Sequence, residues 1–131
     1  MNILILVKLI AAHVIGDFFL QTDKICDGKY TKGARRIFYL AIHSGINALL
    51  AYVLVGLWDC WQIPVIVFFT HYLIDYIKSA IDRGSLWMFI TDQVLHLAII
   101  CGLWVWLTDT VMVSSKNIYL LVEVVPSDSV Q

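Results

Sequence analysis

Histidine and aspartate side chains recur at a fixed spacing inside apolar stretches of this sequence. Three pairs have their members four residues apart: His13 with Asp17, His71 with Asp75, and Asp92 with His96. Residues at this spacing project from one face of a helix, so each pair forms a single polar patch. A fourth histidine, His43, lies in a further apolar stretch. Because neutral imidazole and carboxylate together suit zinc, iron or manganese, the pattern predicts a metal site.

The stretches that carry these side chains are long and apolar. Hydrophobic residues make up 60% of the 131 residues, and charged residues only 15%. One helical crossing of a bilayer needs about 20 mainly apolar residues. Four stretches reach about that length, at residues 3–20, 37–57, 63–81 and 86–107. The sequence therefore predicts an all-α, polytopic membrane protein whose four transmembrane helices form a bundle.

Basic residues predict how the four helices cross the membrane. Five of the nine lie between the first two stretches: Lys24, Lys29, Lys32, Arg35 and Arg36. Lys78 and Arg83 flank the turn between the last two stretches. Short loops rich in lysine and arginine stay in the cytoplasm, so both segments are expected inside. The turn at residues 58–62 has no basic residue and is expected outside, together with both termini.

The chain beyond residue 107 differs in composition from the rest. Residues 1–107 are predicted to form the transmembrane domain and residues 108–131 a polar or interfacial tail, whose apolar part from Ile118 to Val125 is too short to cross a bilayer. We expect the first apolar stretch to stay uncleaved, because it has no basic start and Lys8 interrupts it. The three cysteines imply no disulfide framework, and the net charge of −1 argues against a nucleic-acid partner.

The cost of placing polar groups in lipid predicts where the three patches face. A patch facing hydrocarbon would cost several kcal/mol, so all three are expected to face the interior of the bundle. Consecutive helices run in opposite directions, and the reversed order of Asp92 and His96 then sets aspartate beside aspartate and histidine beside histidine. At about 1.5 Å per residue, the three carboxylates and four imidazoles fall in one layer near the cytoplasmic end. Asn47, four residues after His43, is expected to hydrogen-bond there.

Catalysis is expected if this layer holds a divalent metal, with zinc favoured and iron or manganese as alternatives. Six side chains are predicted to ligate or support it: His13, Asp17, His71, Asp75, Asp92 and His96. The candidate catalytic residues are Asp17, Asp75 and Asp92, and the candidate substrate contacts are Lys78, His43 and Gln21. A metal lowers the pKa of bound water and makes hydroxide available. Hydrolysis of a lipid or lipid-linked substrate is therefore the first hypothesis, with membrane lipids as partners.

Other interpretations use the same residues. A single buried His/Asp pair is often a satisfied ion pair, although three pairs at one depth exceed what helix association needs. Lys78 could neutralise Asp75, three residues before it, instead of binding substrate. Chains of aspartate and histidine also serve as proton or ion pathways, but the outer half of the helices is nearly devoid of polar residues. A non-enzymatic partner or sensor would use the basic loop and the tail, in a homo-oligomer or beside other membrane subunits.

Four linked motifs resemble a known family. They are HVIGDFFLQTDK from His13 to Lys24, His43 at the start of the second stretch, HYLIDYIK from His71 to Lys78, and DQVLH from Asp92 to His96. Over residues 3 to about 107 they resemble the bacterial integral membrane proteins grouped as domain-of-unknown-function family 3307. The resemblance implies a bacterial or phage-borne protein of the inner membrane. The HxxxD spacing is also similar to that of bacterial membrane-bound metal-dependent hydrolases, an analogy at the level of the motif.

Overall fold

Helices make up almost all of the part of the chain that the structure describes. This computed structural model describes residues 2–81 and 84–124, with side chains as far as residue 114. The elements are α1 (Ile3–Val14), the π-helix η1 (Ile15–Phe19), α2 (Asp23–Lys29), α3 (Gly33–Val55), α4 (Gln62–Ile81) and α5 (Leu86–Val124). The predicted all-α class is confirmed.

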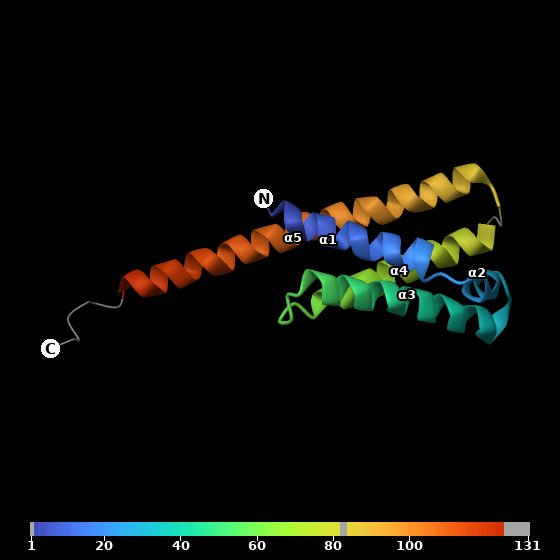
Figure 1. The fold of residues 1–131 in the computed structure, drawn as a ribbon, viewed down its shortest axis with the longest axis horizontal. Coiled ribbons are helices and arrows are strands. Elements are labelled where there is room, and N and C mark those ends of the chain that lie inside the picture. The colour runs from blue at the N-terminus through green and yellow to red at the C-terminus, as the bar shows by residue number, and fades with distance from the viewer. Residues whose placement is uncertain (1, 82–83, 125–131) are drawn as a thin grey trace.

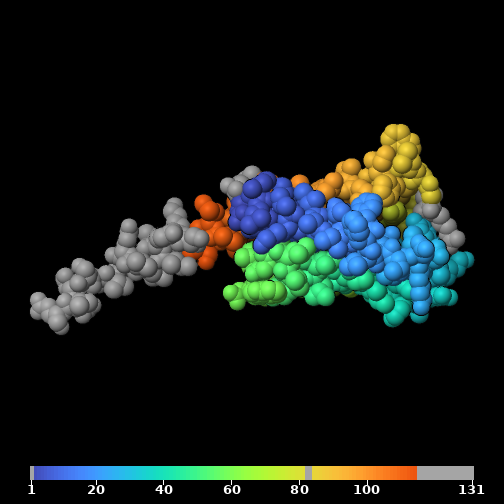
Figure 2. Space-filling model, in the orientation of Figure 1, coloured from blue at the N-terminus to red at the C-terminus, as the bar shows by residue number. Residues whose placement is uncertain are grey.

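Four of these helices form a bundle in which consecutive long helices run in opposite directions (Figure 1). Each of them contacts mainly two neighbours, in the order α1, α3, α4, α5 around the bundle. The short α2 contacts α3 and lies at one end of the bundle, and Figure 2 shows α1 and α2 against α3 on one face. All the helices that carry histidine or aspartate pairs therefore border one interior.

Local sequence explains where several helices begin and end. Asn2 caps α1 because its side chain accepts a hydrogen bond from the Leu4 amide at 3.1 Å. Thr22 caps α2 in the same way, accepting from the Ile25 amide at 3.4 Å. Gly56 ends α3 with a φ of 74°, in the left-handed region that favours glycine.

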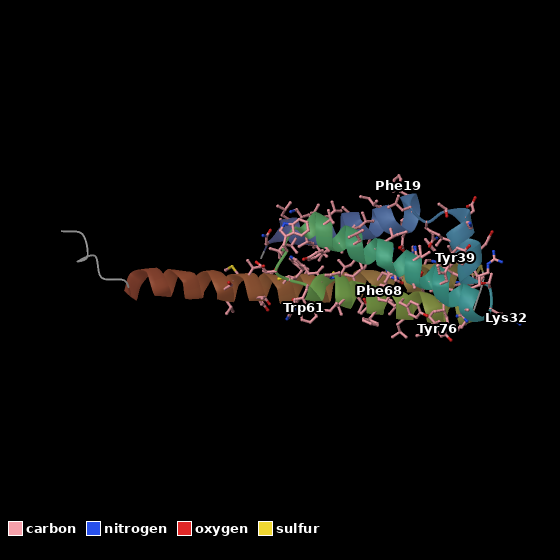
Figure 3. The ribbon with its side chains drawn as sticks, turned by 90° about the horizontal axis from the view of Figure 1, so that it is seen from below. Phe19, Lys32, Tyr39, Trp61, Phe68 and Tyr76 are labelled. Carbon is pink, nitrogen blue, oxygen red and sulfur yellow. The ribbon has the colours of Figure 1, made fainter. Side chains whose placement is uncertain are left out.

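An apolar core fills the end of the bundle away from α2. Its buried members are Ile5, Leu9, Ala12, Ala51, Val55, Ile63, Ile100, Leu103 and Leu107. They come from α1, the last part of α3, the start of α4 and the middle of α5. In Figure 3, Lys32 marks the α2 end of the bundle and Trp61 lies toward this opposite, apolar end.

The outside of the bundle is apolar as well, with side chains such as Phe19 (76% exposed) and Trp87 (77% exposed). Such a surface is typical of a membrane protein. Two helices, Gly33–Val55 and Leu86–Ser114, are long and apolar enough to cross a membrane, and a third span results if Ile3–Phe19 and Asp23–Lys29, bent by 90°, count as one. The structure thus supports two to three candidate spans and does not confirm four. The stretch 63–81 is not among these candidate spans, because its polar stripe lowers its mean hydropathy.

The structure adds detail at two predicted boundaries. The segment between the first two stretches is not a simple loop, because it contains α2. The predicted boundary at residue 107 does not coincide with a helix end, because α5 continues to Val124. At about 1.5 Å per residue α5 is roughly 58 Å long, so it projects well beyond the bundle (Figure 1). An interfacial role for residues 108–124 stays a prediction, and the rest of the tail lies outside the described residues.

The close approach of α2 to α3 depends on Gly28. A Cβ atom added there would lie 2.1 Å from the ring of the buried Tyr39, so alanine must displace that ring. We expect Gly28→Ala to lower the free energy of unfolding by about 1–3 kcal/mol, measured by thermal unfolding in detergent. Gly102→Ala is the matched control, because no described atom lies within 4 Å of its Cβ position. Equal losses in the two variants would contradict this account of Gly28.

Candidate metal centre

Seven histidine and aspartate side chains meet inside the bundle, between the apolar core and α2. They are His13, Asp17, His43, His71, Asp75, Asp92 and His96, and none is more than 8% exposed. Their donor atoms form three overlapping groups that could hold a metal ion. The predicted convergence of four imidazoles and three carboxylates is therefore confirmed.

Three donor atoms, drawn from two of these groups, lie within 3.2 Å of one another, and we call them the donor triangle. His43 Nε2 and His71 Nε2 are 3.0 Å apart, and each lies 3.2 Å from Asp17 Oδ1. In a tetrahedral site with metal–ligand distances of about 2.0–2.1 Å, the ligand atoms are separated by about 3.3 Å. Asp75 Oδ2 lies close by, 3.4 Å from His43 Nε2 and 4.0 Å from His71 Nε2. The triangle thus has the size of one face of a metal tetrahedron.

His43, a candidate substrate contact from the sequence, lies within the donor triangle. In the structure its side chain is 1% exposed and its Nε2 atom is a corner of the donor triangle. A buried corner of this kind also suits a metal ligand, and the substrate contact stays a prediction.

The π-helix η1 and a glycine position the remaining corner, Asp17. The Leu20 amide donates to the Ile15 carbonyl, five residues earlier, at 2.9 Å, which is the spacing of a π-helix turn. A Cβ atom on Gly16 would lie 2.2 Å from Asn47 Oδ1, so only glycine leaves room for this amide. Asn47 Nδ2 then donates to Asp17 Oδ1 at 3.1 Å, as its spacing from His43 predicted.

Two lysines pair with the other carboxylates. Lys29 Nζ lies 2.7 Å from Asp75 Oδ2, and this pair is buried, with the side chains 9% and 3% exposed. Lys78 Nζ lies 2.7 Å from Asp92 Oδ2, across the gap between α4 and α5, and not against Asp75 on its own helix. Gln21, predicted to contact substrate, accepts a hydrogen bond from Lys29 at 2.6 Å. Both Gln21 and Lys78 are therefore already engaged with charged groups of the site.

Lys29 and Gln93 are the members of the site that the sequence analysis missed. In the sequence Lys29 is one of five basic residues of a polar segment, which predict only its side of the membrane. The signal available for Lys29 was a capping threonine at Thr22 followed by a short helical segment. Gln93 Nε2 donates to Asp92 Oδ2 at 3.1 Å and to Asp17 Oδ2 at 3.4 Å. The sequence feature that indicates Gln93 is its position three residues before His96, on the same face of the helix.

His96 has the hydrogen bonding of a ligating histidine. Its Nδ1 lies 2.8 Å from the backbone carbonyl of Asp92, an acceptor, so this nitrogen carries the proton. Its Nε2 is buried and has no hydrogen-bond partner among the described residues, and the same holds for Asp92 Oδ1. Metal-bound histidines commonly donate their other N–H to a carbonyl in this way. The His96 ring lies 4.2 Å from that of His71 and 4.9 Å from that of His13, between centroids.

Cavities lie on two sides of the cluster. A cavity of about 180 Å³, the polar cavity, faces α2 and is bordered by Lys29, Lys78 and the three aspartates of the cluster. A smaller cavity of about 30 Å³, the inner cavity, lies toward the apolar core and is bordered by His13, His71 and His96. A water molecule needs about 10–15 Å³ of such space, so the inner cavity has room for about two or three. Outside the helical spans, burial raises the pKa of Tyr30 above its usual value of 10.0, so its phenol is neutral at pH 7.

The fold and the cluster together define a helical membrane protein with a buried histidine–aspartate centre that could hold a metal. The chain belongs to the family described as "Protein of unknown function (DUF3307)", which matches residues 5–125. This confirms the resemblance seen in its motifs. No curated protein and no solved structure matches the chain.

Proposed function

We propose that this chain is a metal-dependent hydrolase of the bacterial inner membrane that cleaves a lipid or lipid-linked substrate. In this proposal α1 with η1, α3, α4 and the first part of α5 are the four spans, both termini lie outside, and the cluster lies near the cytoplasmic face. One observation carries the proposal: the donor triangle of His43, His71 and Asp17 has edges of 3.0, 3.2 and 3.2 Å. Zinc is the favoured metal because nitrogen and oxygen ligands at this separation suit its tetrahedral geometry.

The contacts of each side chain support different roles. When bound, the metal supplies a Lewis acid and an activated water. Asp92 is the favoured base, because its Oδ1 has no hydrogen-bond partner among the described residues and can accept a proton. Gln93 holds Asp92 near Asp17 by hydrogen bonds to both carboxylates. Lys29 and Lys78 border the polar cavity beside the three aspartates, and with a divalent metal bound the positive charges there outweigh the carboxylates and favour an anionic part of the substrate.

The apolar core favours an enzyme over a transporter. A transport pathway must open to both sides of the membrane, whereas buried side chains such as Leu9, Ala51 and Leu107 fill the end of the bundle beyond the cluster. Among the described residues, the polar cavity therefore places access to the cluster at the α2 end of the bundle axis. One-sided access suits hydrolysis of a substrate that comes from the cytoplasmic leaflet.

The proposal is tested on the purified full chain in two steps. Plasma mass spectrometry should find about one equivalent of zinc, iron or manganese per chain. The metal-loaded protein is then placed in liposomes of phosphatidylethanolamine and phosphatidylglycerol, and lipid mass spectrometry should detect hydrolysis products. No metal after incubation with each of the three ions would overturn the metal site. Metal without any lipid product would overturn the hydrolase.

A further inference from the structure

A groove between α4 and α5 opens on the outside of the bundle, close to the cluster. Its volume is about 280 Å³, and its walls include Ile66 of α4 and Trp106 of α5. Ala98 and Gly102 of α5 lie four residues apart along it, and both are exposed. Small residues on the same helix face make this surface concave. In a bilayer the medium that reaches this groove is hydrocarbon.

The groove lies next to the cavity that touches the imidazoles. Thr70, Ile99 and Leu103 border both the groove and the inner cavity, so the two spaces meet at these side chains. The inner cavity in turn touches His71 and His96. The lipid-facing groove is thus separated by a single layer of side chains from a cavity that touches the cluster on the side away from the polar cavity.

A second groove of the bundle lacks this connection. It lies between α3 and α4, has a volume of about 350 Å³ and is bordered by Gly45 and Phe68. None of the residues that border it also borders the inner cavity. Size and apolar lining alone therefore do not distinguish the α4/α5 groove, but its position directly beside the inner cavity does.

We infer that the α4/α5 groove takes the hydrocarbon chain of the substrate, which enters sideways from the bilayer between these two helices. The inference rests on the proposed function and names the substrate class: a lipid with an anionic head group in the polar cavity and one chain in the groove. The polar cavity and the groove lie on opposite sides of the cluster along the bundle axis. A lipid whose head group lies in the polar cavity at the interface has its chain pointing toward the bilayer centre. Such a lipid extends past the cluster, from the polar cavity to the groove.

The head group and the hydrocarbon chain of this lipid contribute differently to binding. A hydrocarbon chain gains little by leaving lipid tails for an apolar groove, because both surroundings are equally apolar. Affinity then comes from the head group beside Lys29 and Lys78, and the groove sets the position of the chain. Filling the groove must therefore act by steric exclusion of the chain.

Phenylalanine placed in each groove tests this inference. Gly102→Phe fills the α4/α5 groove, where no described atom lies within 4 Å of the glycine's Cβ position. Gly45→Phe is the control in the other groove, where the nearest atom, of Phe68, is 4.0 Å away. Phosphatidylglycerol is the probe, and native mass spectrometry of the full chain in detergent counts how much stays bound. We expect Gly102→Phe to lower the bound fraction about tenfold and Gly45→Phe to leave it unchanged.

Measurements on the same samples separate the possible failures. Equal lipid binding by both variants, with their metal retained, would overturn the groove while the metal site stands. If Gly102→Phe changes the mass of the protein–detergent complex, the groove is an interface between copies of the chain and the inference is wrong. Should Gly102→Phe fail to fold, Ala98→Phe fills the same groove from an exposed position and must give the same loss.

Discussion

Asp17→Asn is expected to lower the affinity of the protein for its metal by about a hundredfold or more. Asp17 Oδ1 is the corner of the donor triangle that lies 3.2 Å from both His43 Nε2 and His71 Nε2. Asparagine keeps the shape of the side chain but removes its negative charge, which is the main attraction for a divalent cation. Plasma mass spectrometry of purified protein, followed by titration against a zinc-chelating dye, measures the loss.

Asp109→Asn is the matched control for this change. Asp109 lies on α5, is exposed, and is far along the helix from the cluster, so the same chemical change there should leave the metal in place. His43→Gln extends the comparison, because the triangle predicts loss of metal whereas a substrate contact would leave the metal bound. Equal metal content in Asp17→Asn and the wild-type protein would show that Asp17 is not a metal ligand and would overturn the donor triangle.

Lys29→Met is expected to lower the free energy of unfolding by about 3–5 kcal/mol. The Lys29 ammonium lies 2.7 Å from Asp75 Oδ2, and the two side chains are 9% and 3% exposed. Methionine fills much of the same volume but leaves the carboxylate buried without its cation. Such an uncompensated charge is among the largest single costs in a folded protein. Unfolding by heat in detergent, followed by circular dichroism, measures the difference.

Two further variants show whether loss of the Lys29–Asp75 ion pair causes the fall in the free energy of unfolding. Lys24→Met makes the same change at an exposed position of α2 and should alter stability by less than about 0.5 kcal/mol. Adding Asp75→Asn to Lys29→Met removes the orphaned charge, so the double variant should recover most of the loss. If Lys29→Met behaves like Lys24→Met, the buried pair contributes nothing to stability.

Spacing along the chain was enough to predict the cluster. A helix repeats every 3.6 residues whatever surrounds it, so His71 and Asp75 share a face in any helical fold. The reversed order of Asp92 and His96 then predicted that like groups would meet across antiparallel helices. The ring centroids of His71 and His96, 4.2 Å apart, agree with that expectation.

The ion-pair partners of Lys29 and Lys78 could not be predicted from spacing along the chain. The helix α2 has seven residues, too few for a periodic pattern, and isolated helices of that length are unstable in water. It forms because Thr22 caps it and because Gly28 lets it approach Tyr39. Only this contact with α3 brings Lys29 to Asp75. A long, flexible side chain in a polar segment has many possible partners, and its sequence neighbours do not select one.

The sequence by itself determined the helical class, the apolar character and which side chains share a stripe, because these follow from local backbone geometry and composition. Tertiary structure decided which stripes meet atom to atom. The placement of His43 in the donor triangle and of Lys78 against Asp92 depends on how far each helix is rotated and shifted against its neighbours. Rotation and shift are set by the sum of many side-chain contacts along whole helices, and no single motif contains that sum.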